Sequence, residues 1–187
     1  AGRWAGRLNG IFLRFAGRFA GEGQDWKQYA LSMLVFNAAM FAVSFGCLAL
    51  QQWLPLNPDG RGALEGSLIF NTAASFASNT NLQHYSGEVS MSYFSQLFAL
   101  MWLQFVSAAT GIAALAALAR GLAGRVNMGN FFMDLQRATF LVLLPLALVV
   151  ASLMVLGGVP MTLAGAAQAQ TLEGVAQTIS RGPVAAF

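Results

Sequence analysis

The sequence predicts an all-α integral membrane fold in which two membrane crossings flank a re-entrant loop and a third crossing follows. The first observation is composition, because 57% of the 187 residues are hydrophobic and only 9% are charged. Soluble domains carry about 25% charged residues, so a soluble all-helical core is the poorer interpretation. The second observation is that long uncharged apolar segments alternate with polar turns. The third is residues 71–83, NTAASFASNTNLQ, a polar run without charge between two apolar segments.

Residues 1–29 form a basic segment that contains glycines and aromatic residues. Its basic residues are Arg3, Arg7, Arg14, Arg18 and Lys27. A secretory signal needs an unbroken apolar core, which Arg14 and Arg18 interrupt. Two interpretations remain open: a segment that lies on anionic lipid headgroups, and an ordinary cytoplasmic loop of the kind the positive-inside rule describes.

Three segments are predicted to cross the membrane, because each is apolar over a length that spans the hydrocarbon core at about 1.5 Å per helical residue. They are residues 30–50, 94–119 and 138–157. The second has a face of small residues, which lets helices approach closely in lipid. The third contains Pro145, which we expect to kink it.

Between the first two crossings, residues 64–83 are predicted to form a short helix over 64–78 and an extended exit. The amides of this stretch could not face acyl chains, because their polar groups would lack partners. They could lie at membrane depth if protein surrounds them or if they line a watery path. A simple external loop is the alternative that the pattern alone leaves open.

The basic residues predict the orientation of the chain. Residues 1–29 and 120–137 together hold eight of the ten Lys and Arg residues, and only Arg61 and Arg181 lie elsewhere. The positive-inside rule then makes these two segments cytoplasmic, with the 64–83 loop and a polar segment, 158–187, on the external side. Within 120–137, the i, i+3 spacing of Asp134 and Arg137 predicts a local ion pair.

The predicted loop has the chemistry of a site for a monovalent cation. A short helix that enters the membrane points the partial negative charge of its carbonyl end inward, and an extended segment would present further carbonyl oxygens. Uncharged oxygens favour K⁺ or a similar large cation, whereas divalent cations prefer carboxylates. The chain contains one cysteine and one histidine, no phosphate-binding loop and no nucleic-acid-binding module.

The stretch NTAASFASNTNLQHYSGEVSMSYFSQ, followed by FVSAATGIAALAALARG, closely resembles the KdpA family, the potassium-binding subunits of the bacterial Kdp potassium-transporting ATPase. Further matches lie apart, at WKQY (26–29), LPLN (54–57), TLEG (171–174) and GPVA (182–185). The resemblance covers nearly the whole chain.

This resemblance implies four helix–pore-loop–helix repeats of the potassium-channel-like superfamily, of which the chain would hold the first (30–119) and the leading helix of the second. We therefore expect a fragment of a longer polypeptide in the bacterial inner membrane. K⁺ captured from outside would pass to a KdpB-like P-type ATPase subunit, with KdpC-like and KdpF-like small subunits completing the complex. Catalysis of ATP hydrolysis would then belong to a partner subunit and not to this chain.

The resemblance also assigns the expected K⁺ filter residues of the first repeat, which are Ser78, Asn79, Thr80, Asn81 and Gln83. Gln83 matches the glutamine that is implicated in ion selectivity in the family. The family commonly has Trp before and Ser after it, whereas this chain has Leu82 and His84. His84 raises the question of a pH effect near the mouth, although an exposed loop histidine is usually solvated and inert.

Two alternative functions remain open at this stage. A passive K⁺ channel or a secondary K⁺ transporter could be built on the same repeat, and only the energy source and the partner would distinguish it. A membrane scaffold that transports nothing is the other alternative, and it predicts that substitutions in the filter leave ion handling unchanged.

Overall fold

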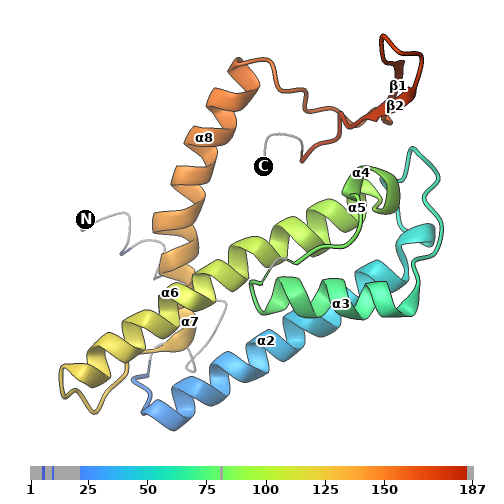
Figure 1. The fold of residues 1–187 in the computed structure, drawn as a ribbon. Helices are drawn as coiled ribbons and strands as arrows, with labels where there is room; N and C mark the ends of the chain where they lie inside the picture. The colour runs from blue at the N-terminus through green and yellow to red at the C-terminus, as the bar shows by residue number, and fades with distance from the viewer. Residues whose placement is uncertain (1–5, 7–9, 11–21, 81, 185–187) are drawn as a thin grey trace. The chain divides into compact units, whose positions relative to one another are not determined.

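The computed structural model describes residues 6, 10, 22–80 and 82–184 and is mostly helical (Figure 1). The helices and strands, in chain order, are α2 (Trp26–Ala49), η2 (Gln51–Trp53), α3 (Gly66–Ala77), α4 (Gly87–Ser90), α5 (Tyr93–Ser95), η3 (Gln96–Met101), α6 (Trp102–Leu122), α7 (Phe131–Arg137), η4 (Ala138–Leu143), α8 (Leu144–Leu156), β1 (Ala167–Gln170) and β2 (Ala176–Ile179). Most of the basic segment 1–29 and the expected filter residue Asn81 lie outside the described residues.

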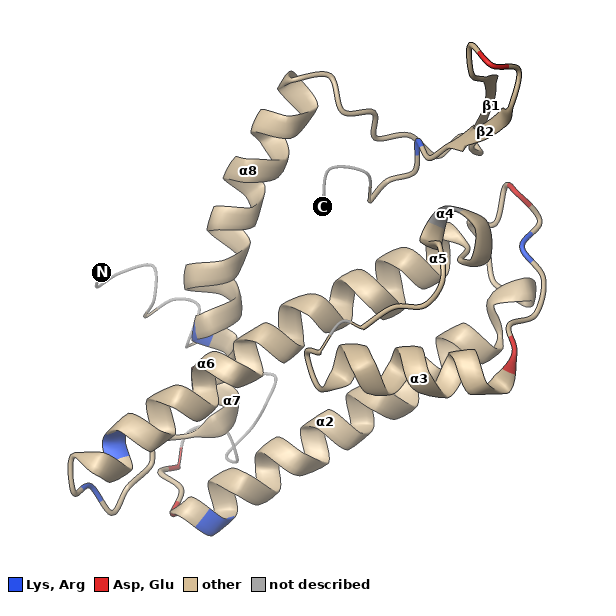
Figure 2. Cartoon of the chain, in the orientation of Figure 1, with Lys and Arg blue, Asp and Glu red and all other residues tan. Residues whose placement is uncertain are grey.

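Three helical stretches are long and apolar enough to cross a membrane, as the fold class requires. They are Trp26–Ala49 (24 residues), Tyr93–Leu122 (30 residues) and Phe131–Leu156 (26 residues). In Figure 2 the charged residues of the described chain lie in loops and near the ends of the long helical stretches. The prediction of a helical membrane fold is confirmed: the described structure is mostly helical, and three of its helices could cross a membrane.

Two of the crossings begin earlier in the chain than their apolar segments do, because polar side chains cap them. Asp25 and Gln28 form a reciprocal capping box: Asp25 Oδ1 accepts from the Gln28 N–H at 2.8 Å and Gln28 Oε1 accepts from the Asp25 N–H at 3.1 Å. Asn130 caps α7 by accepting from the Met133 N–H at 3.2 Å. Capping therefore adds a helical turn or more of less apolar sequence to each crossing.

Two of the crossings contain a π-helical stretch, η3 and η4, where the helix widens by one residue per turn. η4 ends two residues before Pro145. Proline cannot donate to the preceding turn and its ring crowds the carbonyl there, so a wide turn immediately before it relieves the clash. The helix continues through Pro145 to Leu156 by this local adjustment.

The chain divides into two compact units. The first contains the N-terminal half of α2, most of α6, α7 and η4. Its core is built on Tyr29, Ala113 and Phe131, with the rings of Tyr29 and Phe131 packed edge to face at 5.7 Å. The hydroxyl of Tyr29 donates to the Ala113 carbonyl at 2.7 Å and lies 3.1 Å from Asp134 Oδ2.

The predicted Asp134–Arg137 pair is wrong, because Asp134 instead makes a two-pronged ion pair with Arg120. Arg120 Nη2 lies 2.9 Å from Asp134 Oδ1, and Arg120 Nη1 contacts Asp134 Oδ2 and the Met128 carbonyl. Asp134 is buried and Arg137 is exposed. The buried Asp134 carboxylate pairs with Arg120, because the packing of the structure brings the guanidinium next to it. Arg137 has the helical spacing for a pair, but its side chain is exposed to solvent.

The second unit contains the C-terminal half of α2, the whole segment from η2 to η3, and the chain from residue 147 onward. Within it, α3 lies alongside α2 (Figure 1), and the rings of Phe41 and Phe70 meet edge to face at 5.7 Å. At the end of α2, the fully buried Gln51 donates to the Gly62 (2.7 Å) and Ser90 (3.1 Å) carbonyls.

The polar segment after α8 contains a β-hairpin that the sequence analysis missed. β1 and β2 pair antiparallel, with Ala167 opposite Ile179 and Gln170 opposite Ala176. The turn between them contains Gly174 with φ of +81°, and the Gly174 N–H donates to the Thr171 carbonyl at 2.9 Å. The family-like TLEG motif is thus the turn of this hairpin.

Candidate functional site

The loop that follows α3 begins with a Schellman motif that reverses the chain. The Asn79 N–H donates to the Phe76 carbonyl (3.3 Å) and the Thr80 N–H donates to the Ser75 carbonyl (3.0 Å). Asn79 occupies the left-handed region with φ of +59°, the position that glycine usually fills and asparagine tolerates. The motif directs residues 78–80 away from the helix axis at its carbonyl end.

Ser75 holds the returning chain against the helix. Its Oγ accepts a hydrogen bond from the Leu82 N–H at 2.7 Å and lies 3.2 Å from both the Leu82 carbonyl and Thr80 Oγ1. Its own carbonyl also accepts from the Thr80 hydroxyl at 3.1 Å. Ser75 is buried, and its side chain therefore holds Thr80 and Leu82 close to the end of α3.

Sequence reasoning did not single out Ser75, although it lies within the polar 71–83 run. A small hydroxyl residue in the last turn of a helix, with an asparagine just past the C-cap, is the signal that could have identified it. Its contacts with Thr80 and Leu82 hold the loop that contains the expected filter residues.

The expected filter residues in the described part of the chain lie in this loop and are exposed. The hydroxyls of Ser78 and Thr80 lie 3.2 Å apart, and the Ser78 hydroxyl also donates to the Ala74 carbonyl at 2.8 Å. Ser78, Asn79, Thr80 and Gln83 are all exposed. Asn81 lies outside the described residues. The loop thus presents a cluster of hydroxyl and backbone oxygens at a helix end.

The electrostatics of this end favour a cation. The last turn of α3 contains no basic residue, so the partial negative charge of the helix carbonyl end is not compensated there. From Gly66 to Gly87 the sequence contains no Asp, Glu, Lys or Arg. A cation at this end would meet oxygens with partial charges only, which bind a weakly hydrated monovalent ion without trapping it.

Gln83 lines a cavity of about 600 Å³ in the second unit. Two further amides, Gln96 and Gln104, line the same cavity, together with apolar side chains such as Phe76. The Gln96 amide is oriented by donating to the carbonyls of Met91 (3.1 Å) and Gly87 (3.3 Å). The cavity wall is therefore polar but carries no formal charge.

Tyr85 follows the loop and packs back toward α3. Burial raises the pKa of the Tyr85 phenol, and the nearby Thr72 hydroxyl opposes this shift as a weaker effect. Thr72 lies on α3 and is buried. The phenol of Tyr85 is therefore a neutral group at physiological pH, and it adds no charge to the wall of the cavity that it lines.

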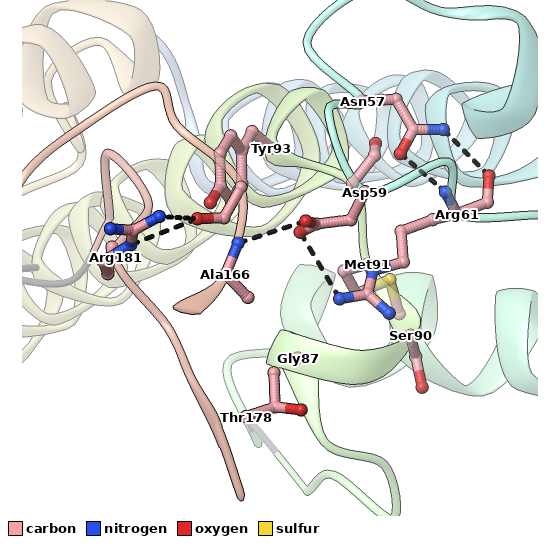
Figure 3. A network of polar contacts seen from close by, with 12 residues as sticks. Asn57, Asp59, Arg61, Gly87, Ser90, Met91, Tyr93, Ala166, Thr178 and Arg181 are labelled. Carbon is pink, nitrogen blue, oxygen red and sulfur yellow. Dashed lines mark hydrogen bonds and ion pairs between the residues drawn. The ribbon is translucent and has the colours of Figure 1, made fainter. Parts of the chain in front are cut away.

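A network of polar contacts connects the loop before α3 with the segment after α8 (Figure 3). Asp59 Oδ1 accepts from the Ala166 N–H (3.1 Å), and Asp59 Oδ2 pairs with Arg61 (3.4 Å). Arg181 donates through Nε (3.2 Å) and Nη2 (2.8 Å) to the Gly165 carbonyl. The segment after α8 is thus attached to the loop that precedes α3.

Tyr93 provides a second attachment between the same segments. Its hydroxyl donates to the Ala164 carbonyl at 2.6 Å, and its N–H donates to the Leu56 carbonyl at 3.1 Å. Gly182 packs closely against its ring, where a Cβ would come within 2.6 Å of Tyr93 Cε1. The glycine of the family-like GPVA motif is therefore required by a close approach of backbone to an aromatic ring.

Comparison with known proteins gives one consistent result. The chain matches, over residues 1–187, the family model described as "KdpA: Potassium-transporting ATPase A subunit". It is 53% identical over 174 residues, 92% of the chain, to the potassium-transporting ATPase potassium-binding subunit of Pseudomonas entomophila. The subunits of the same name from Pseudomonas aeruginosa (49% over 180 residues, 95% of the chain) and Granulibacter bethesdensis (46% over 182 residues, 96% of the chain) are similar as well. The matches cover 31% or 32% of these relatives, so the chain spans about a third of their length.

Proposed function

Since the chain belongs to the KdpA family of potassium-transporting ATPase A subunits, we propose that it binds K⁺ and translocates it selectively as the channel-like subunit of an ATP-driven uptake complex. The observation that carries the proposal is the loop after α3, where a Schellman motif and Ser75 present uncharged oxygens at the carbonyl end of a helix. The proposed K⁺ site is formed by Ser78, Asn79, Thr80, Asn81 and Gln83.

The arrangement of the chain in the membrane is part of this proposal. Residues 1–29 and 120–137 are cytoplasmic, residues 30–119 form the first helix–pore-loop–helix repeat, and the 64–83 loop dips in from outside. The crossing at 138–157 begins a second repeat and leads to the external segment 158–187. The excess of Lys and Arg in the first two segments supports this orientation in a bacterial inner membrane.

The partners are proposed on the same basis. The names of the relatives describe a subunit of a potassium-transporting ATPase, which implies a catalytic subunit elsewhere in the complex. We assign that role to a KdpB-like P-type ATPase subunit, with KdpC-like and KdpF-like small subunits. K⁺ is the transported ion, and the residues of this chain contribute its selection and none of the phosphoryl transfer.

Gln83→Arg tests the function most simply. A fixed positive charge about 8 Å from a K⁺ ion costs about 2 kcal/mol at an effective dielectric of 20, which corresponds to about a thirtyfold loss of affinity. ATP hydrolysis by the purified complex should therefore need about thirtyfold more K⁺ for half-maximal stimulation. Gln177→Arg, on the exposed face of β2, is the matched control and should behave as the unmodified protein does.

The same titration separates the alternative functions. Stimulation by low K⁺ and not by Na⁺ supports an ATP-driven pump. If the rate of ATP hydrolysis does not depend on K⁺ while K⁺ flux continues, the protein is a passive channel or secondary transporter and the proposal fails. Unchanged K⁺ handling in Gln83→Arg would favour a scaffold role.

A further inference from the structure

The first unit contains an open groove of about 470 Å³ between the N-terminal end of α2 and the C-terminal end of α6. Its walls are almost entirely apolar and include Trp26 and Met33 from α2 and Leu118 and Leu122 from α6. Trp26 is 65%, Leu118 60% and Leu122 82% exposed, so this surface is open in the described structure. Both helices belong to stretches that could cross a membrane.

Small residues create the groove and a polar network fixes its floor. Ala30, Ala117 and Gly121 line it, and their short side chains leave the space between the helices unfilled. The floor includes Tyr29, which is held by its hydrogen bond to the Ala113 carbonyl. The groove is thus a fixed feature of the packing between α2 and α6.

A cation lies at the rim of the groove. The Lys27 ammonium lies 5.5 Å from the centre of the Trp26 ring, which forms part of the groove wall. Among the neighbouring charges, Asp25 is engaged in the capping box of α2 and Arg120 in the ion pair with Asp134. Lys27 is exposed and is thus a described cation that a ligand outside the protein can reach, on an aromatic side chain of the kind that anchors proteins at headgroup level.

We propose that this groove binds one acyl chain of an anionic phospholipid, with the phosphate of its headgroup at Lys27. An apolar slot that ends at an ammonium matches the two parts of such a lipid: the chain enters the slot and the phosphate meets the cation. The basic ends of these helices would face the cytoplasmic leaflet in the orientation proposed above, which is the leaflet where anionic lipids attract basic residues.

A transmembrane helix of a partner is the competing occupant. Helix docking in lipid uses small residues along a continuous strip and needs no cation at its end. Here small residues line the groove on α6 at Ala114, Ala117 and Gly121, but the long side chains of Trp26, Met33, Leu118 and Leu122 line it as well. Flexible apolar walls and a terminal ammonium fit an acyl chain with a charged head better than they fit a second helix.

The test uses the intact protein in its complex, placed in phosphatidylcholine nanodiscs that contain a small fraction of phosphatidylglycerol with a photoreactive diazirine in its acyl chain. After illumination, mass spectrometry of the digested protein locates the cross-links. A parallel sample has the diazirine on phosphatidylcholine. The proposal predicts strong labelling of the peptide that contains Leu118 and Leu122 by phosphatidylglycerol and much weaker labelling by phosphatidylcholine.

Two variants separate the chain from the headgroup. Gly121→Leu fills the groove, and its Cβ would meet only the Met128 side chain, with Sδ at 3.7 Å and Cε at 3.9 Å, so the backbone has no clash to relieve. Gly111→Leu is the matched control, because it lies on the same helix with no neighbouring atom within 4 Å of its Cβ. We expect Gly121→Leu to reduce labelling to the phosphatidylcholine level, and Gly111→Leu to leave it unchanged. Lys27→Gln should weaken the preference for phosphatidylglycerol about fivefold.

Three results would overturn the proposal. Equal labelling by both lipids would mean that the groove holds only bulk lipid. Labelling that Gly121→Leu does not change would place the lipid outside the groove. No labelling of this peptide by either lipid would show that lipid does not occupy the groove in the intact complex.

Discussion

The side-chain oxygen of Ser75 accepts a hydrogen bond of 2.7 Å from the backbone N–H of Leu82, so the last turn of α3 holds the chain that leaves the candidate K⁺ loop. Leu82 follows Ser75 by seven positions, and all the expected filter residues except Gln83 lie between them. The geometry of the loop therefore depends on a side chain that contributes no expected ligand.

Ser75→Ala should loosen this loop. It leaves the Leu82 N–H without its partner, at a cost of about 1–3 kcal/mol, and we expect the K⁺ concentration for half-maximal ATPase stimulation to rise severalfold while the maximal rate falls less. Ser67→Ala is the control, because Ser67 lies on the same helix and its hydroxyl only contacts the exposed Glu65 carboxylate. Equal effects of the two variants would show that Ser75 has no special role.

Substitution of Asn79 separates a backbone role from a ligand role. Its φ of +59° is accessible to glycine without strain, whereas alanine costs about 1 kcal/mol there. If the conformation is what matters, Asn79→Gly keeps the K⁺ affinity and Asn79→Ala lowers it. The affinity is read from K⁺ titrations of ATP hydrolysis. An equal loss of K⁺ affinity in both variants would instead indicate that the Asn79 side chain is a ligand.

Asp134→Asn should destabilise the first unit, because it leaves the guanidinium of Arg120 without its carboxylate and weakens the contact to Tyr29. A loss of about 1–3 kcal/mol is expected for this partly exposed pair. Arg137→Gln should change the stability little, because Arg137 is exposed and Asp134 pairs with Arg120. The midpoint of thermal unfolding in detergent measures the stability of both variants. A larger loss of stability in Arg137→Gln than in Asp134→Asn would instead support the Asp134–Arg137 pair that the sequence predicts.

Gly182→Ala should disrupt the attachment of the segment after α8. The added Cβ would lie 2.6 Å from Tyr93 Cε1, which the rigid ring can avoid only by moving away from the Ala164 carbonyl. We expect faster proteolysis of residues 158–184 in this variant. Gly66→Ala has no neighbouring atom within 4 Å and serves as the control. Unchanged proteolysis of Gly182→Ala would contradict the close packing against Tyr93.

The crossings could be predicted from sequence because their signal is simple: an uncharged apolar stretch long enough for a bilayer. Their ends were less well predicted, since the capping box at Asp25 and the cap at Asn130 extend helices into polar sequence. The β-hairpin was missed because its strands are four residues long and contain mainly Ala and Gln, which have little strand preference.

The polar run and the family resemblance located the candidate site, but they did not predict its geometry. The spacing of Ser75 and Leu82 gives no hint of a hydrogen bond until the chain reverses at Asn79. Similarly, Arg120 and Asp134 are 14 residues apart and meet only because α6 and α7 pack together. Local spacing predicts local pairs, and these contacts depend on tertiary structure. Whether residues 78–81 and Gln83 bind K⁺ remains a prediction.

The most direct test of that prediction is to locate a heavy K⁺ analogue in the intact complex by the anomalous scattering of Tl⁺. The proposed function predicts a peak beside the oxygens of Ser78 and Thr80, which excess K⁺ removes and excess Na⁺ does not. Tl⁺ bound elsewhere in the protein, with this loop empty at a concentration that stimulates ATP hydrolysis, would contradict the assignment of the loop as the K⁺ site.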